Sequence, residues 1–246
     1  MPSLWFVMPV HGRESLAAVC MRQLRRTCDQ LTTRGVHASA VMVGDDDNLA
    51  TARELGFATV RRNNQYLSRK FNDGIQLAMD ERFNPRPADY VVPIGSDDWV
   101  DWRLFHNLPN GSTMVGFPHM SFVREDGQEL TATRLDYPGG SGIRIWPRPL
   151  MKRMGYRPAD ERLSRGCDTS ILLNVQREIG CNIEHRDSDP RQIVDWKTVG
   201  ENVNPYDTVA RRWRGRSMGD PYDALRDMYP EDALEDMQAH YGLVPA

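Results

Sequence analysis

Short apolar runs alternate with amphipathic stretches over the first 95 residues of the chain. The apolar runs have the length and composition of buried strands, and the stretches between them carry apolar residues at helical spacing. The predicted strands are Leu4–Val10, Ala38–Val43, Ala58–Arg61 and Tyr90–Ile94, and the predicted helices are Glu14–Leu31, Leu49–Leu55 and Tyr66–Phe83. Strands and helices that alternate in this way form a parallel sheet with right-handed crossovers. The pattern therefore predicts an α/β protein with a Rossmann-like, mostly parallel central sheet flanked by helices.

Beyond residue 98 the pattern changes to shorter pieces that are broken by turn signals. The predicted pieces are short strands within Thr113–Arg134 with a hairpin tip at Glu125–Gln128, a strand at Ile143–Trp146, helices at Arg148–Met154 and Asp168–Ile179, and amphipathic helices within Tyr222–Tyr241. We therefore divide the chain into a domain of residues 1–199, with a nucleotide-binding half (1–98) and an acceptor half (99–199), and a C-terminal helical extension (200–246).

Composition narrows the class of protein. The chain has 246 residues with a net charge of −3, so it lacks the basic footprint of a typical nucleic-acid binder. Its four cysteines form no C-x-x-C pair, and Cys20 and Cys28 fall on the apolar stripe of a predicted helix, which favours buried free thiols. The sequence has no apolar stretch of the ~18 residues that a membrane span needs, and no signal peptide. We expect a cytoplasmic protein, in the host cytoplasm if a phage encodes it.

Polar residues follow each of the four predicted strands. In chain order, these clusters are Pro9-Val10-His11-Gly12-Arg13, Asp45-Asp46-Asp47, Asn63-Asn64 and Gly95-Ser96-Asp97-Asp98. The carboxyl ends of parallel strands share one edge of the sheet, where α/β proteins bind ligands, so the four clusters are expected to converge. Neither the glycine pattern of a dinucleotide site nor that of a P-loop is present.

The cluster that ends in Asp97 and Asp98 is the most specific of the four. Adjacent carboxylates repel each other unless a cation or a proton intervenes, and a hard divalent ion that bridges to phosphates removes the conflict. The other interpretation is a solvated turn or helix N-cap, where Ser and Asp are common. The convergence of all four clusters favours a metal–diphosphate site.

The order of these pieces resembles the GT-A-fold nucleotide-sugar glycosyltransferases, specifically the large inverting family that includes polysaccharide and O-antigen transferases. The matching pieces are Met8–Arg13, Val43–Asp46, the Asn63-Asn64…Lys70-x-Asn72-x-Gly74 segment and Gly95–Asp98, and the resemblance covers about residues 4–180. It implies a single GT-A-like domain. The chain departs from the family at Gly95, where an Asp is frequent.

The resemblance implies roles for individual residues, and each is an expectation. The residues expected to line the nucleotide or its phosphates are Pro9, Val10, His11, Arg13, Asp45, Asn64, Lys70, Asn72, Ser96 and Asp97. Among these, Asp45 would accept a hydrogen bond from the base. Asp98 would be the principal ligand of a Mn²⁺ or Mg²⁺ ion, with Asp97 beside it. His185 is a further candidate ligand, although a single His is more often structural.

The catalytic base of the family usually stands at the start of a late helix, in an acidic pair. Asp168 occupies that position here, and Cys167 replaces the second acid. One carboxylate suffices to deprotonate an acceptor hydroxyl. The alternative is that Asp168 only caps its helix. The glycines at 139, 140 and 142 either approach the sugar or form a surface hairpin loop.

The resemblance implies a metal-dependent inverting glycosyltransferase that uses a nucleoside-diphosphate sugar, with a UDP-sugar favoured. The acceptor is open: a glycan, a lipid-linked sugar, a protein or a modified DNA base all remain. Two alternatives stay open as well. One is a nucleotidyltransferase acting on sugar phosphates, and the other is a non-catalytic nucleotide-sugar-binding protein.

Overall fold

In the computed structural model, the larger of two sheets has seven strands in the order β10-β6-β9-β4-β1-β2-β3. The structure describes residues 1–126, 129–137, 141–180, 183–197 and 215–242. In chain order, the strands of this sheet are β1 (Ser3–Pro9), β2 (His37–Gly44), β3 (Ala58–Arg61), β4 (Tyr90–Pro93), β6 (Met114–Gly116), β9 (Arg144–Pro147) and β10 (Ile183–His185). Strands β3, β2, β1 and β4 are mutually parallel, and β9 is antiparallel to both β4 and β6. The α/β class with a mostly parallel central sheet is therefore confirmed.

A second sheet of five strands lies beside the first, in the order β12-β8-β7-β11-β5. Its strands are β5 (Asp98–Val100), β7 (His119–Asp126), β8 (Glu129–Asp136), β11 (Ile193–Lys197) and β12 (Arg216–Gly219). Strands β7 and β8 form the hairpin that was predicted from the turn signals. Strands β5, β11 and β12 were not predicted, because each is short and pairs with residues far away in the chain.

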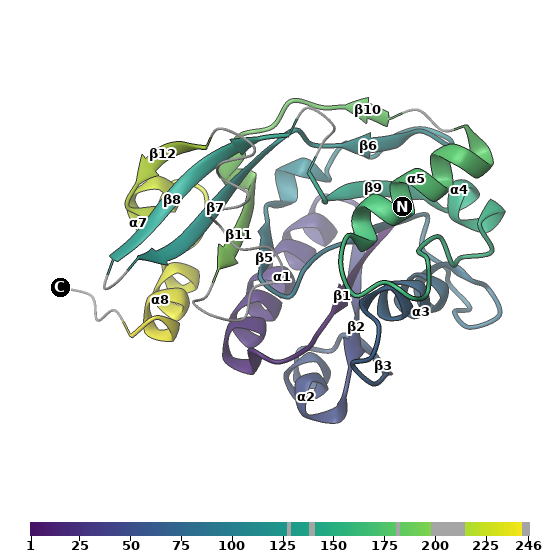
Figure 1. The fold of residues 1–246 in the computed structure, drawn as a ribbon, viewed down its shortest axis with the longest axis horizontal. Coiled ribbons are helices and arrows are strands. Elements are labelled where there is room, and N and C mark those ends of the chain that lie inside the picture. The colour runs from purple at the N-terminus through teal and green to yellow at the C-terminus, as the bar shows by residue number, and fades with distance from the viewer. Residues whose placement is uncertain (127–128, 138–140, 181–182, 198–214, 243–246) are drawn as a thin grey trace.

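Helices cover both faces of the larger sheet. The helical elements are α1 (Glu14–Thr33), α2 (Asp46–Glu54), α3 (Leu67–Met79), η1 (Trp102–Leu104), α4 (Arg148–Arg153), α5 (Cys167–Ile179), η2 (Pro190–Gln192), α7 (Pro221–Leu225) and α8 (Glu231–His240). Helices α1 and α2 share a core with one sheet face, and α3, α4 and α5 share a core with the other. Figure 1 shows α7, α8 and the second sheet gathered on the side of the molecule away from α3 and α4.

Helix α3 ends earlier than predicted, at Met79 rather than Phe83. The reason is local, because the carboxylate of Asp80 accepts hydrogen bonds from the backbone N–H and the guanidinium of Arg82. Such side-chain bonds to nearby backbone compete with the helical pattern. The chain therefore turns at Asp80 and leads back to β4.

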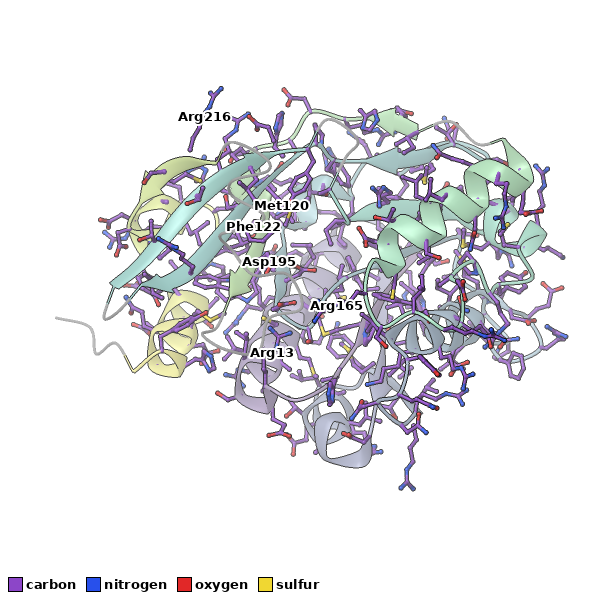
Figure 2. All side chains as sticks on the ribbon, in the orientation of Figure 1. Arg13, Met120, Phe122, Arg165, Asp195 and Arg216 are labelled. Carbon is purple, nitrogen blue, oxygen red and sulfur yellow. The ribbon has the colours of Figure 1, made fainter. Side chains whose placement is uncertain are left out.

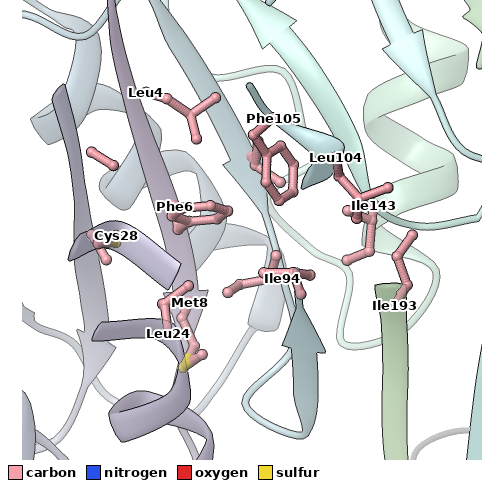
Figure 3. Close-up of a cluster of buried hydrophobic side chains, with 14 of the residues drawn as sticks. Leu4, Phe6, Met8, Leu24, Cys28, Ile94, Leu104, Phe105, Ile143 and Ile193 are labelled. Carbon is pink, nitrogen blue, oxygen red and sulfur yellow. The ribbon is translucent and has the colours of Figure 1, made fainter. Parts of the chain in front are cut away.

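The core on the α1 side of the larger sheet is built from alternate residues of β1 (Figure 3). Phe6 lies edge-on to Phe105 with ring centroids 5.1 Å apart, and Leu4 and Met8 continue the same row. Cys28 is fully buried in this cluster, and Cys20 is fully buried where α1 meets the second sheet, as predicted for both thiols.

No helix in the described part of the chain combines the length and apolarity required to cross a bilayer.

Candidate metal and nucleotide site

Three carboxylates meet where the two sheets join. Oxygen atoms of Asp97, Asp98 and Asp195 all lie within 4.8 Å of one another. Asp97 and Asp98 follow β4, whereas Asp195 comes from β11, almost 100 residues later in the chain. Asp195 is 7% exposed, and the other two are partly buried. Like charges at this separation favour a bound cation, and carboxylate oxygens are the ligands that Mg²⁺ and Mn²⁺ prefer.

Strand pairing places Asp195 opposite Asp98. Strands β5 and β11 are antiparallel with Asp98 and Asp195 in register, and the backbone N–H of Trp196 donates to the carbonyl of Asp97 at 2.9 Å. On the other side of β11, Asp195 is in register with Phe122 of β7, and Figure 2 shows the two side chains close together. The register thus fixes the spacing of the carboxylates through backbone hydrogen bonds.

Because Gly95 has no side chain, the carboxylates of Asp97 and Asp98 have space to point inward. Its N–H donates to Oδ2 of Asp98 at 2.5 Å. A Cβ atom at position 95 would lie 2.6 Å from Oδ1 of Asp97 and 2.9 Å from Oδ2 of Asp98. Glycine at this position therefore has a steric reason, because any larger residue would displace both carboxylates.

Arg13 is the cation that faces this group. Its Nη1 lies 2.9 Å from Oδ2 of Asp97. Burial disfavours the charged guanidinium, but the charge and hydrogen bond of Asp97, together with the charge of Asp195, outweigh burial and raise the pKa of Arg13. Gly12 and Arg13 both adopt left-handed backbone conformations, with φ of 56° and 49°. A left-handed conformation is uncommon for an arginine, and here it lies at the N-cap of α1.

A second polar network links the ends of β1, β2 and β3. Lys70 of α3 donates from Nζ to the carbonyl of Val10 at 2.6 Å and to Oδ1 of Asn64, and Asn64 donates from Nδ2 to Oδ2 of Asp45 at 2.6 Å. Lys70 is 1% exposed. Burial lowers its pKa to about 8, although the carboxylate of Asp45 opposes the shift. With the Arg13–Asp97 pair, this network brings together all four predicted clusters.

Four further residues that were predicted to line a nucleotide are Pro9, Val10, His11 and Ser96. Pro9 ends β1, and the N–H of Val10 donates to the carbonyl of Val43. Ser96 is buried beside the carboxylates, whereas His11 is exposed. In the cluster after β2, the carboxylate of Asp45 accepts the hydrogen bond from Asn64, and Asp46 is the first residue of α2.

Asn72 is held inside the protein. Its Nδ2 donates to the carbonyl of Ala159 at 2.9 Å, and its Oδ1 accepts from the N–H of Ala159 at 2.9 Å. The side chain is fully buried. These contacts join α3 to the segment before α5, so Asn72 has a structural role that the sequence did not indicate.

Asp168 lies in the first turn of α5, which follows the left-handed Gly166. A Cβ at Gly142 would lie 3.3 Å from Oδ2 of Asp168, so the end of the glycine-rich loop rests against this carboxylate. Positions 139 and 140 of the loop lie outside the described residues. Burial lowers the pKa of the neighbouring Arg144 guanidinium, and the charge of Asp168 opposes that shift.

His185 is not part of the carboxylate group. It is exposed on β10, at one edge of the seven-stranded sheet, where it is in register with Gly116. Asp195 supplies the third acidic side chain instead. The available signal for Asp195 was a single acid inside the apolar run Ile193–Trp196, a pattern that marks a charge held at a buried position.

The chain resembles known proteins in its fold and not in its sequence. No protein-family model matches the chain, and no curated protein matches it in sequence. Solved structures with a similar arrangement include a Drosophila β-1,4-galactosyltransferase 7 mutant in complex with manganese, UDP-Gal and xylobiose, at 16% identity and a TM-score of 0.48. That alignment covers 75% of this chain, which spans 65% of the length of the galactosyltransferase chain.

Two further structures are similar at the same level. One is the 4-diphosphocytidyl-2C-methyl-D-erythritol synthase of Anaerococcus prevotii, with 9% identity, a TM-score of 0.45 and coverage of 85% of this chain and 96% of that chain. The other is a Mycobacterium tuberculosis protein in complex with manganese, with 14% identity, a TM-score of 0.42 and coverage of 87% and 98%. Likeness at this level concerns the general α/β arrangement and carries no argument about activity.

Proposed function

We propose that this chain is a metal-dependent inverting glycosyltransferase that moves a sugar from a nucleoside-diphosphate sugar, with a UDP-sugar favoured, to an acceptor hydroxyl. One observation carries the proposal: Asp98 and Asp195 face each other beside Asp97 and Arg13, where the parallel sheet meets the second sheet. Ligands bind to open α/β sheets at the carboxyl ends of the strands, and this group lies there.

The carboxylates fit a Mn²⁺ or Mg²⁺ ion. Asp97, Asp98 and Asp195 would hold the ion through oxygen atoms that already lie within 4.8 Å of one another. When bound, the ion supplies positive charge that stabilises the diphosphate leaving group. Arg13 is placed to contribute to the same task, because its guanidinium is held at the group by Asp97.

The network at Asp45 is proposed to hold the base of the nucleotide. Asn64 fixes one carboxylate oxygen of Asp45, and Lys70 fixes Asn64. A carboxylate that is oriented in this way can accept a hydrogen bond from the N–H of uracil or guanine. Lys70 is buried, so it would act on the base through Asn64 and Asp45 and would not contact the base directly.

Asp168 is proposed to act as the base. It would take the proton of the acceptor hydroxyl while the hydroxyl oxygen bonds to the anomeric carbon of the donor sugar. The bond between that carbon and the diphosphate oxygen breaks, and the diphosphate leaves with the electron pair. Positioning and electrostatics account for most of the rate in such a transfer.

The test combines donor binding with donor cleavage. UDP-, GDP- and dTDP-sugars are screened by thermal shift with Mn²⁺ or with EDTA, and UDP release is then followed with water as the acceptor. We expect a UDP-sugar to raise the melting temperature only with Mn²⁺, through mass action. Asp168→Asn should retain this shift but lose UDP release by about 10²–10⁴-fold, the usual contribution of a general base.

Glu178→Gln, at the opposite end of α5, is the matched control and should behave like the wild type. A Mn²⁺-dependent shift without any UDP release would instead indicate a binding protein. Pyrophosphate release from a nucleoside triphosphate and a sugar phosphate would indicate a nucleotidyltransferase. Full UDP release by Asp168→Asn would remove Asp168 from the mechanism.

A further inference from the structure

The C-terminal segment of residues 215–242 packs directly behind the carboxylate group. Strand β12 pairs with β8, and α8 lies along α1. Three ion pairs join the helices: Arg22–Asp236 at 3.0 Å, Arg26–Asp232 at 2.6 Å and Arg26–Asp236 at 3.7 Å. Exposed pairs of this kind contribute little to stability, so the buried contacts of the segment matter more.

The buried contacts centre on two tryptophans that follow the metal-site aspartates in sequence. Trp99 comes directly after Asp98, and Trp196 comes directly after Asp195. Successive side chains of a strand point to opposite faces of the sheet. The two aspartates therefore face the site, and the two tryptophans face the C-terminal segment, where both are almost fully buried.

Aromatic rings of the C-terminal segment hold these tryptophans in place. Trp99 and Trp196 meet with ring centroids 5.0 Å apart, and Tyr229 lies 5.0 Å from Trp99. Tyr222 and Tyr241 approach Trp196, with centroids at 6.5 and 6.2 Å. Buried aromatic pairs at these distances are directional and resist displacement.

Tyr229 contacts β5 and the η2 turn that leads into β11. Its ring packs on Trp99 of β5, and its hydroxyl donates to the carbonyl of Arg191 at 3.1 Å, just before β11 begins. Burial raises the pKa of this hydroxyl well above its ordinary value, so it stays protonated and able to donate. A single side chain thus bridges the two backbone segments whose spacing separates Asp98 from Asp195.

We propose that Tyr229 is a positioning residue that fixes the spacing of Asp98 and Asp195 and so sets the affinity of the site for a divalent cation. The inference rests on the proposed metal site and assigns a role to the C-terminal segment. Side chains that pack against the residues that bind a metal tune its affinity, because they fix the orientation of those residues. Removal of the Tyr229 ring frees Trp99 to shift, and Asp98 moves with it.

The test measures binding of Mn²⁺ alone to the full chain, by electron paramagnetic resonance of the free ion. Tyr229→Leu should weaken Mn²⁺ binding about tenfold, whereas Tyr229→Phe, which keeps the ring and loses only the hydrogen bond to the carbonyl of Arg191, should weaken it by a smaller factor of about threefold. Phe57→Leu removes a buried aromatic ring at the start of β3 and is the matched control for lost packing. It should lower the melting temperature without changing Mn²⁺ affinity.

Tyr241→Leu provides a milder variant in case Tyr229→Leu does not fold, and it should weaken Mn²⁺ binding in the same direction. The positioning role would be overturned if the folded Tyr229→Leu or Tyr241→Leu variant bound Mn²⁺ with wild-type affinity. If Asp98→Ala still abolished binding in that case, the metal site itself would remain supported. Absence of Mn²⁺ binding by the wild type, or unchanged binding by Asp98→Ala, would overturn the metal site itself.

Discussion

Gly95 shows how much of this site depends on a single missing side chain. The turn after β4 must bring Asp97 and Asp98 to the same side, and a Cβ at position 95 would fall within 2.9 Å of a carboxylate oxygen of each. Real Cβ atoms do not tolerate such contacts, so the carboxylates would have to move. Glycine at position 95 therefore permits the tight turn, and Asp195 supplies the third carboxylate from another strand.

Gly95→Ala should weaken Mn²⁺ binding about tenfold or more, because the new methyl group displaces both carboxylates. Isothermal titration calorimetry with Mn²⁺ measures the change. Gly116→Ala is the control, since a Cβ there would meet the side chain of Ile183 at 3.1 Å, on β10. Both variants are expected to lose some stability. Equal Mn²⁺ affinity in Gly95→Ala and the wild type would mean that these carboxylates do not hold the ion.

At the scale of elements, α3 connects the ends of β1 and β2 to the segment before α5. Lys70 bonds to the end of β1 and, through Asn64, to the end of β2, while Asn72 bonds to the segment that leads to α5. Both residues were expected to lie near the nucleotide or its phosphates, and both are buried in the structure. Their first contribution is to hold together the loops that surround the site.

Lys70 should make stability depend on pH in a defined window. Its pKa in the folded protein is about 8, below the ordinary 10.5, so the unfolded chain binds more protons between these values. The difference in unfolding free energy between the wild type and Lys70→Met should therefore not change with pH below pH 8. It should rise by up to about 3 kcal/mol as the pH increases from 8 to 10.5.

Urea unfolding of both proteins at pH 7, 8.5 and 10 measures this difference, and comparison with Lys70→Met cancels the titration of other groups. At pH 7 the variant also loses the bonds to Val10 and Asn64, so its own stability indicates how much the buried network contributes. A pH-independent difference between the two proteins would show that Lys70 keeps its ordinary pKa.

At the scale of the whole molecule, local periodicity predicted the parallel sheet and its helices. Of the second sheet only the β7–β8 hairpin was predicted. Strand β5 has three residues and pairs with β11 about 95 residues later, so no local pattern indicates that pairing. The same long-range pairing explains the site. Asp97, Asp98 and Arg13 were predictable from strand ends, whereas Asp195 joins them only through the register of β11.

We expect Asp97, Asp98 and Asp195 together to hold a divalent cation on which nucleoside-diphosphate binding depends. Calorimetric titration of UDP into the wild type and Asp195→Asn, each in Mn²⁺ and in EDTA, tests it directly, with Asp187→Asn as the matched control. We expect UDP to bind the wild type and Asp187→Asn only with Mn²⁺, and Asp195→Asn to bind at least about tenfold more weakly. UDP affinity that is the same in EDTA, or unchanged by Asp195→Asn, would contradict this account.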